Sequence, residues 1–245
     1  RELLKVSWSD QTTWRGEYDG LNHWRQAIEN TGVLVFQVSG IQMKEMRGTC
    51  IPDAPFPVIV INNKDAPKGR VFTLLHEFAH ILMHQAGHAT SRIEGKREPG
   101  EQKMEIAANA FAAATLLPRT DFITLVEEYP SAKQGDDEAL TKLSSLSAVS
   151  SEVVLRRMRT LNLASEEVYR RKRAEWRARP LPVKAKSEGG PLMDVKTVSK
   201  LGPGYITLML QGYHQNAVSS SEISDALGVK LKHLDAITQR VFAYA

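Results

Sequence analysis

The chain has 245 residues, of which 42% are hydrophobic and 24% are charged, and its formal net charge at pH 7 is +4. This composition is ordinary for a globular protein, and no apolar run approaches the ~20 residues that span a bilayer. The first residues, RELLKVSWSDQ, lack the basic-then-apolar pattern of a signal peptide. Cys50 is the only cysteine, which excludes a disulfide framework and leaves histidine and carboxylate as metal ligands. We therefore expect a cytoplasmic protein without a membrane partner.

The first half of the chain predicts a compact α+β unit, because β-branched runs alternate there with segments of helical spacing. The expected elements are, in order, a helix over 14–31, strands in VLVFQVSG, EMRGTCIP and FPVIVIN, a helix over 69–85, an exposed loop over 87–103, and a helix in MEIAANAFAAATLLP that Pro118 stops.

The second half of the chain predicts helices only. They are expected over 119–128, 137–147, 151–162 and 165–178, followed by a linker, RPLPVKAKSEGGP, and two or three helices in the last 50 residues. We therefore divide the chain into an α+β domain over 1–125, a helical region over 126–180, and a linker with a small helical region over 181–245.

Four polar side chains interrupt the apolar helix VFTLLHEFAHILMHQ. His76 and His80 are four residues apart, so both project from one helix face and can share one metal ion. Glu77 points to the side of this pair, where it can act as a general base on a water molecule without being a ligand. Burying polar groups is costly unless they are paired or bind a metal, so we interpret the pattern as a metal site with Glu77 as the catalytic residue. An accidental match in a core helix is the alternative.

A third ligand is expected from a neighbouring element. Glu105 is the candidate, because it opens the next helix and the alanines after it permit close approach of the two helices. The alternative is a first-turn acid stabilised by the helix dipole. Glu101 is the competing ligand, but it lies in the expected polar loop. A His/His/Glu site fits Zn²⁺, although Mn²⁺ as the working ion stays open.

Three further polar residues lie near this pattern. Asn109, one turn after Glu105, is a candidate hydrogen-bond partner of a ligand or a packing residue. His84, one turn beyond His80, is a candidate substrate contact or a half-exposed residue at the helix end. Arg70, just before the motif, is a candidate anion clamp or a solvated side chain.

Two segments together, PVIVINNKDAPKGRVFTLLHEFAHILMH and EIAANAFAAATLLP, resemble the ImmA/IrrE family of zinc metallopeptidases. The resemblance implies a minimal zincin-like peptidase domain in which His76, His80 and Glu105 bind zinc and Glu77 is the general base. It also implies a cytoplasmic, site-specific endopeptidase. Such enzymes cleave a helix-turn-helix repressor and so switch on stress, phage-defence or mobile-element genes.

The segment DEALTKLSSLSAVSSEVVLRRMRTLNL resembles a helix-turn-helix, and the run RRKRAEWRARPLPVKAK is strongly basic. Together they suggest DNA, single-stranded or without sequence preference, as a further partner, with Trp176 available for base stacking. The alternatives are a helical hairpin that packs on the peptidase and a solvated helix end. The candidate nucleic-acid contacts are Arg156, Arg157, Arg170, Arg171, Lys172 and Arg173.

Two functions follow from these patterns. The first is a zinc endopeptidase, and the second is a DNA-binding regulator whose metal site is structural or degenerate. Glu77 favours the first, because a hydrolase needs a general base and a structural metal site does not.

Overall fold

The computed structural model describes residues 1–16, 18–53, 55–85, 99–179 and 192–242. Its sheet has three strands in the order β1-β3-β2. Strand β1 (Leu34–Val38) is parallel to the central strand β3 (Val58–Asn62), and β2 (Gly48–Ile51) pairs with β3 in the antiparallel sense. The three predicted strands and the α+β class are therefore confirmed.

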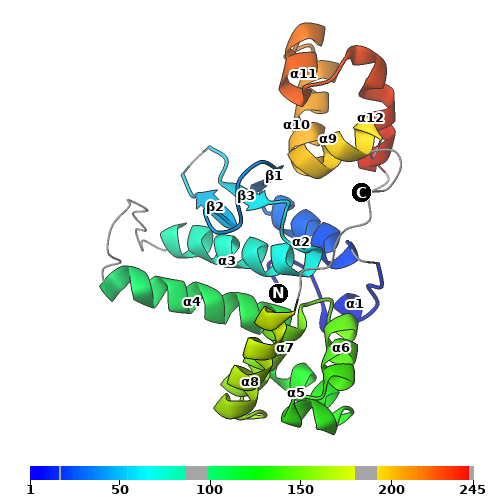
Figure 1. The fold of residues 1–245 in the computed structure, drawn as a ribbon. Helices are drawn as coiled ribbons and strands as arrows, with labels where there is room; N and C mark the ends of the chain where they lie inside the picture. The colour runs from blue at the N-terminus through cyan, green and yellow to red at the C-terminus, as the bar shows by residue number, and fades with distance from the viewer. Residues whose placement is uncertain (17, 54, 86–98, 180–191, 243–245) are drawn as a thin grey trace.

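The helices α2 (Asp19–Glu29) and α3 (Pro67–Gln85) pack together and against the sheet (Figure 1). Their apolar faces supply fully buried side chains such as Trp24 and Phe78, and β3 contributes Ile59 and Ile61. Helix α4 (Pro99–Leu116) crosses below α3 and packs along it. This α3–α4 pair carries the residues of the predicted metal site.

Two helix starts differ from the prediction. The segment predicted as one helix from Trp14 contains a loop, and α2 begins only at Asp19, after a short helix α1 (Trp8–Gln11). The Asp19 carboxylate accepts the backbone N–H groups of Arg15 and Gly16, which fixes a turn before the helix. Helix α4 begins at Pro99, inside the predicted loop, because proline is favourable at the first helical position.

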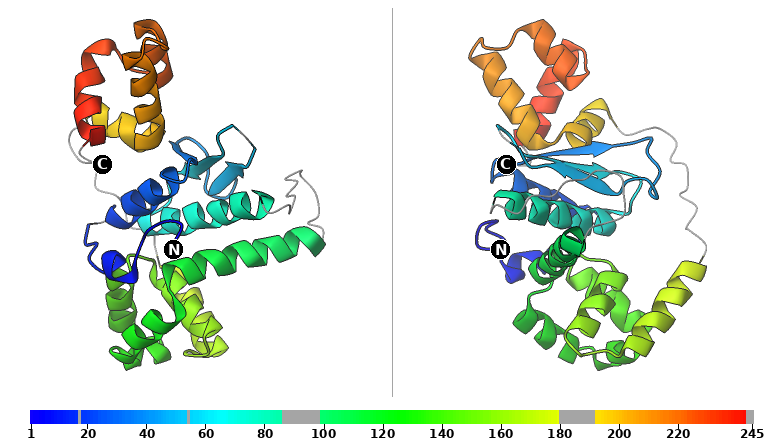
Figure 2. Two further views of the ribbon diagram at one scale, coloured as in Figure 1. Left: turned by 180° about the vertical axis from the view of Figure 1, so that it is seen from behind. Right: turned by 90° about the vertical axis from the view of Figure 1, so that its left-hand side faces the viewer.

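The four helices predicted after Pro118 are confirmed (Figure 2). They lie on the side of α4 opposite to the sheet, and one buried apolar cluster that runs from Leu4 to Tyr169 joins them to the α+β part. Their bounds are Arg119–Glu127 for α5, Asp137–Leu146 for α6, Ser151–Thr160 for α7 and Glu166–Ala178 for α8, with a short 3-10 helix, η1 (Pro130–Gln134), after α5.

The C-terminal lobe, residues 192–242, has a separate buried core that includes Val198, Ile206 and Ile237. It contains four α-helices, so the prediction of two or three is wrong. Gly202, at φ 87°, ends α9, and Pro203 starts α10 at once, so no loop sequence marks the boundary. The helices are α9 (Met193–Leu201), α10 (Pro203–His214), α11 (Ser220–Leu227) and α12 (Leu234–Phe242), with the 3-10 helix η2 (Leu231–His233) before the last.

The predicted linker falls mostly on residues 180–191, outside the described residues. None of the helices within the described ranges combines the length and the apolar character that crossing a bilayer requires.

Candidate metal centre

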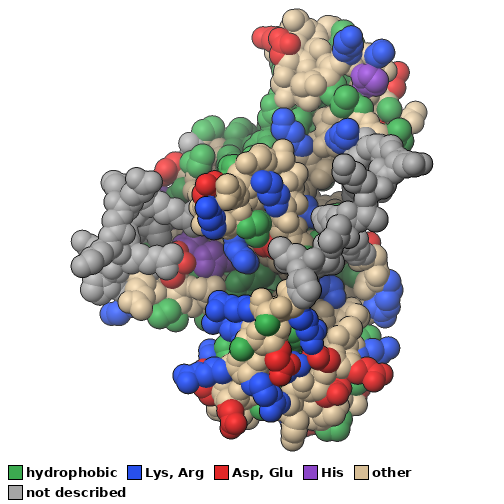
Figure 3. Space-filling model, in the orientation of Figure 1, with side chains coloured by type: hydrophobic (Ala, Val, Ile, Leu, Met, Phe, Trp, Pro, Cys, Tyr) green, Lys and Arg blue, Asp and Glu red, His purple; other side chains and the backbone are tan. Residues whose placement is uncertain are grey.

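Helix α3 turns His76 and His80 of its motif toward α4. Glu77 and His80 are each only 3% exposed, and His76 is half-buried. The imidazole Nε2 atoms of His76 and His80 lie 3.1 Å apart, as expected for two rings one helical turn apart and turned toward a common point. In the space-filling view, histidine side chains reach the surface beside α3 and α4 (Figure 3).

Helix α4 brings Glu105 to this pair. Its carboxylate oxygens lie 3.5 Å from Nε2 of His76 and 3.3 Å from Nε2 of His80. Ala108 and Ala112 are fully buried, and these small side chains allow α4 to lie close to α3. Because α4 starts at Pro99, Glu105 stands in its second turn, and the alternative of a first-turn acid stabilised by the helix dipole is wrong.

The three side chains fit a metal ion by geometry and by chemistry. With bonds of about 2.0–2.1 Å and tetrahedral angles, two ligand atoms of one zinc ion lie about 3.3 Å apart. In the cluster the two Nε2 atoms are 3.1 Å apart, Oε1 of Glu105 is 3.3 Å from His80 and Oε2 of Glu105 is 3.5 Å from His76. Two imidazoles and one carboxylate are also a donor set that catalytic zinc sites use, with a further position left for water or substrate. The cluster is therefore compatible with a zinc peptidase site.

Glu77 lies where the edge strand β2 approaches α3. A Cβ atom added at Gly48 would overlap the methyl group of Thr73 and lie 3.2 Å from Cγ of Glu77. Glycine is therefore required at this position for β2 to approach the motif helix closely. Among the described residues β2 pairs with β3 alone.

The neighbouring candidates have other contacts. The amide of Asn109 donates to the backbone carbonyl of Glu105 at 2.7 Å, within its own helix. Nε2 of His84 lies 3.2 Å from a carboxylate oxygen of Asp53, in the connection between β2 and β3. The side chain of Glu101 lies outside the described residues, as does most of the predicted loop before α4.

Arg70 lies two turns before Glu77 on α3, and its guanidinium donates to the side chain of Gln37 on β1. It lines a separate pocket together with residues of α2 and α9. The buried ion pair of Arg25 and Glu29 in α2 stands next to this pocket and was missed by the sequence analysis. Its signal was an i,i+4 charge pair on the apolar face of the predicted helix.

The basic residues of α7 and α8 are paired within the helical region. Lys172, 5% exposed, lies 2.8 Å from Asp137 and 2.6 Å from Glu175. Each of the other candidate nucleic-acid contacts is also held by a protein group: Arg156 and Arg173 by Glu152, Arg157 by the carbonyl of Leu117, Arg170 by Glu166, and Arg171 by Glu175 and the carbonyl of Gln134.

The predicted recognition helix α7 is itself packed, since every residue of it except Thr160 is buried or half-buried. Trp176 packs against the main core. These contacts favour the packing interpretation of the helix pair α6–α7, and nucleic-acid binding stays a prediction.

Comparison with known proteins decides the family. The family model of the IrrE N-terminal-like domain, Peptidase_M78, matches residues 28–159, more than half of the chain. The chain belongs to this family. The matched segment of this IrrE-like peptidase runs from the end of α2 into α7 and contains the whole cluster of His76, His80 and Glu105 together with Glu77. No curated protein matches the chain with significant sequence similarity.

Proposed function

We propose that the chain is a zinc-dependent endopeptidase in which His76, His80 and Glu105 bind the metal and Glu77 is the general base. The observation that carries this proposal is the position of Glu77. It is a buried carboxylate beside three converging ligand side chains, in a chain of a peptidase family. A structural metal site has no use for such an acid.

When bound, zinc at such a site lowers the pKa of a water molecule and polarises a carbonyl group as a Lewis acid. Glu77 takes the proton that the attacking water loses and can return it to the leaving amine, which is the usual role of a positioned general base and acid. Its burial excludes competing solvent from the carboxylate. The closely packed α3–α4 pair holds the three ligand side chains in place.

The peptidase family of the chain supports a protein substrate. Consistent with the resemblance, the proposed substrate is a helix-turn-helix repressor in the cytoplasm. Its cleavage would switch on stress, phage-defence or mobile-element genes.

The test is the Glu77→Gln variant, which keeps the shape of the side chain and removes the base. Cleavage of a helix-turn-helix repressor encoded beside this chain should slow by about 10²–10⁴-fold, because general-base catalysis contributes about that much. The metal content should stay at the wild-type level. Glu128→Gln, an exposed position on the helical region, is the matched control and should cleave at the wild-type rate.

Normal cleavage by the Glu77→Gln variant would refute the role of Glu77. Wild-type protein that holds the metal but cleaves neither the repressor nor an unfolded protein would favour the alternative, a DNA-binding regulator with a structural metal site.

A further inference from the structure

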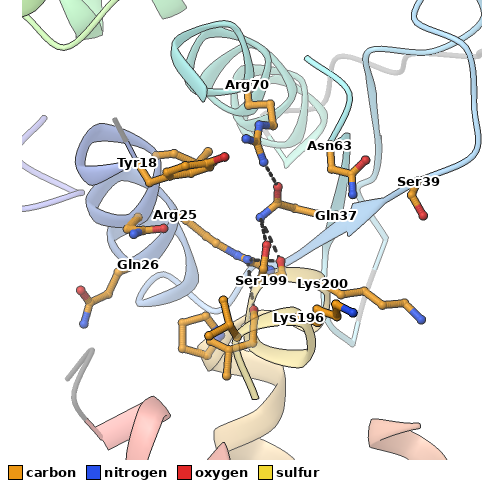
Figure 4. A pocket seen from close by; sticks show the side chains of 15 residues that line it. Tyr18, Arg25, Gln26, Gln37, Ser39, Asn63, Arg70, Lys196, Ser199 and Lys200 are labelled. Carbon is orange, nitrogen blue, oxygen red and sulfur yellow. Dashed lines mark hydrogen bonds between the residues drawn. The ribbon is translucent and has the colours of Figure 1, made fainter. Parts of the chain in front are cut away.

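A pocket that is lined by none of the metal-cluster residues lies between the α+β part and the C-terminal lobe (Figure 4). Its volume is about 730 Å³. It is lined from α2, β1, the start of α3 and α9, so residues more than 160 positions apart in the sequence face one space. Of the 15 described residues that line it, none is acidic, and four are basic: Arg25, Arg70, Lys196 and Lys200.

Arg70 is the most unusual of these cations, because it is 5% exposed and has no carboxylate partner among the described residues. Its guanidinium donates to Gln37 and lies 5.4 Å from the ring centre of Tyr18. Its Nε is buried and has no hydrogen-bond partner among those residues. A guanidinium has five N–H donors, and a buried charge that is incompletely bonded is costly. An anion in the pocket would compensate this charge.

Arg25 shows the contrast. It forms an ion pair with Glu29 at 3.1 Å and donates to the backbone carbonyl of Ser199 at 2.7 Å. Glu29 in turn accepts the backbone N–H of Gly204 at 2.9 Å. The charge of Arg25 is therefore balanced inside the protein, and this pair fastens the C-terminal lobe to α2.

Lys196 and Lys200 add two more positive charges from α9. They are four residues apart, so both ammonium groups lie on one side of the helix, and both are exposed. Within the described part of the chain neither of them has a carboxylate at ion-pair distance. The pocket thus has one buried and two exposed cations without an acidic partner.

We propose that this pocket binds a small phosphorylated molecule of about nucleotide size. The three cations supply positive charge for an anionic ligand, and arginine and lysine both recognise phosphate groups. The volume is that of a pocket for an organic ligand rather than for a single ion. The amides of Asn22 and Asn63 and the half-exposed ring of Tyr18 can contact the uncharged part of such a molecule.

The position of the pocket gives the ligand a structural consequence. Gln37 accepts from Arg70 and donates to the backbone carbonyl of Ser199 at 2.9 Å, so one amide already joins α3 to α9 (Figure 4). A phosphorylated ligand that contacts Arg70 and the two lysines would join the same two elements. Arg70 lies in the first turns of α3, six residues before His76. The ligand would therefore stiffen the start of the helix that carries the metal cluster.

The first test is calorimetric titration of the whole chain with AMP, ribose 5-phosphate, inorganic phosphate and adenosine at low salt. AMP and ribose 5-phosphate should bind, and adenosine should not bind measurably. No binding of either phosphorylated compound at millimolar concentration would overturn the proposal. Equal affinity for adenosine and AMP, or for inorganic phosphate and AMP, would also overturn it.

The second test compares two double variants that remove the same charge from the same lobe. K196Q/K200Q should weaken AMP binding by about ten-fold or more, because a charge-assisted hydrogen bond contributes about that factor. K230Q/K232Q changes exposed lysines outside the pocket and should bind AMP within about two-fold of wild type. Equal affinities of the two variants would refute the assignment of the site.

Both tests measure binding directly, so they do not depend on the proposed peptidase activity. The Glu77→Gln protein should bind AMP as wild type does. If that variant loses cleavage and keeps AMP binding, the two sites are independent. If it loses AMP binding as well, a separate anion pocket is refuted.

Discussion

The metal cluster and the basic helix α8 both concentrate ionisable side chains, but their charges are compensated in different ways. At the α3–α4 pair, two imidazoles and a carboxylate turn their ligand atoms toward one point, 3.1–3.5 Å apart, where a cation from outside the chain fits. In α8, by contrast, Arg170, Lys172 and Arg173 already pair with carboxylates of α6, α7 and α8 itself. The density of charge in a sequence therefore does not mark a site, whereas ligand atoms of different residues that converge on one point do.

The largest effect is expected at the metal cluster. His80→Ala should abolish stoichiometric metal binding, because one of three protein ligands is lost. Glu105→Gln should weaken metal affinity by more than the ~10–100-fold that removal of an outer partner costs. Metal analysis of the purified variants, against an expected ion-to-chain ratio of about one for wild type, measures both effects.

His84→Ala is the matched control for these metal variants, since the imidazole of His84 lies against Asp53 and not within the cluster. It should keep the full metal content. Loss of metal from the His84 variant, or full retention of metal in both cluster variants, would contradict the assignment of the metal site. The contrast between the α3–α4 pair and α8 would then not hold.

The sequence predicted the parts of the molecule that depend on local spacing. The H-E-x-x-H pattern places two histidines one turn apart wherever the segment is helical, and the alanines of α4 explained why Glu105 can come close to them. The sequence did not predict contacts between segments that are far apart in the chain. The pairing of Lys172 with Asp137 joins α8 to α6, and the pocket around Arg70 forms only when α9 packs on β1. Neither has a periodic signal in the sequence.

Helix ends were also predicted poorly, for a local reason. The side chain of Asp19 bonds the two backbone N–H groups before α2, so the apolar spacing that includes Trp14 extends beyond the true helix. At α4 and α10 a proline starts the helix, although a proline in a polar stretch is equally typical of a loop.

A moderate effect is expected in the basic helix. Lys172→Met keeps the apolar stem that packs beside Gly135 but removes a buried ammonium from two carboxylates. Burial alone would lower the pKa of Lys172, but the hydrogen bonds to Asp137 and Glu175 outweigh it and raise the pKa. We expect a loss of about 1 kcal/mol in the free energy of unfolding, reduced from the value of a fully buried pair because both carboxylates are half-exposed.

The control for Lys172 is Arg170→Met, on the exposed side of the same helix, whose partner is Glu166. It should cost less than about 0.5 kcal/mol, because surface ion pairs contribute little. Urea unfolding of both variants, followed by the helical circular dichroism signal, makes the comparison. Equal losses would mean that the internal pairing of Lys172 is not what distinguishes it from a surface cation.

The smallest effect is a pH dependence at Asp137. Hydrogen bonds from Lys172 and Arg179 lower the pKa of this carboxyl to about 2. A carboxyl with a depressed pKa stabilises the folded state above its unfolded pKa of about 3.9, and this contribution is lost as the pH falls toward 2. Asp137→Asn should therefore be less stable than wild type at neutral pH, and the difference should shrink between pH ~4 and ~2.

The control is Glu138→Gln, an exposed neighbour without an ion pair among the described residues. Its difference in stability from wild type should not depend on pH. If the difference in unfolding free energy between Asp137→Asn and wild type stays constant down to pH 2, Lys172 and Arg179 do not stabilise the carboxylate. The ion pairs of α8 would then not compensate its positive charge.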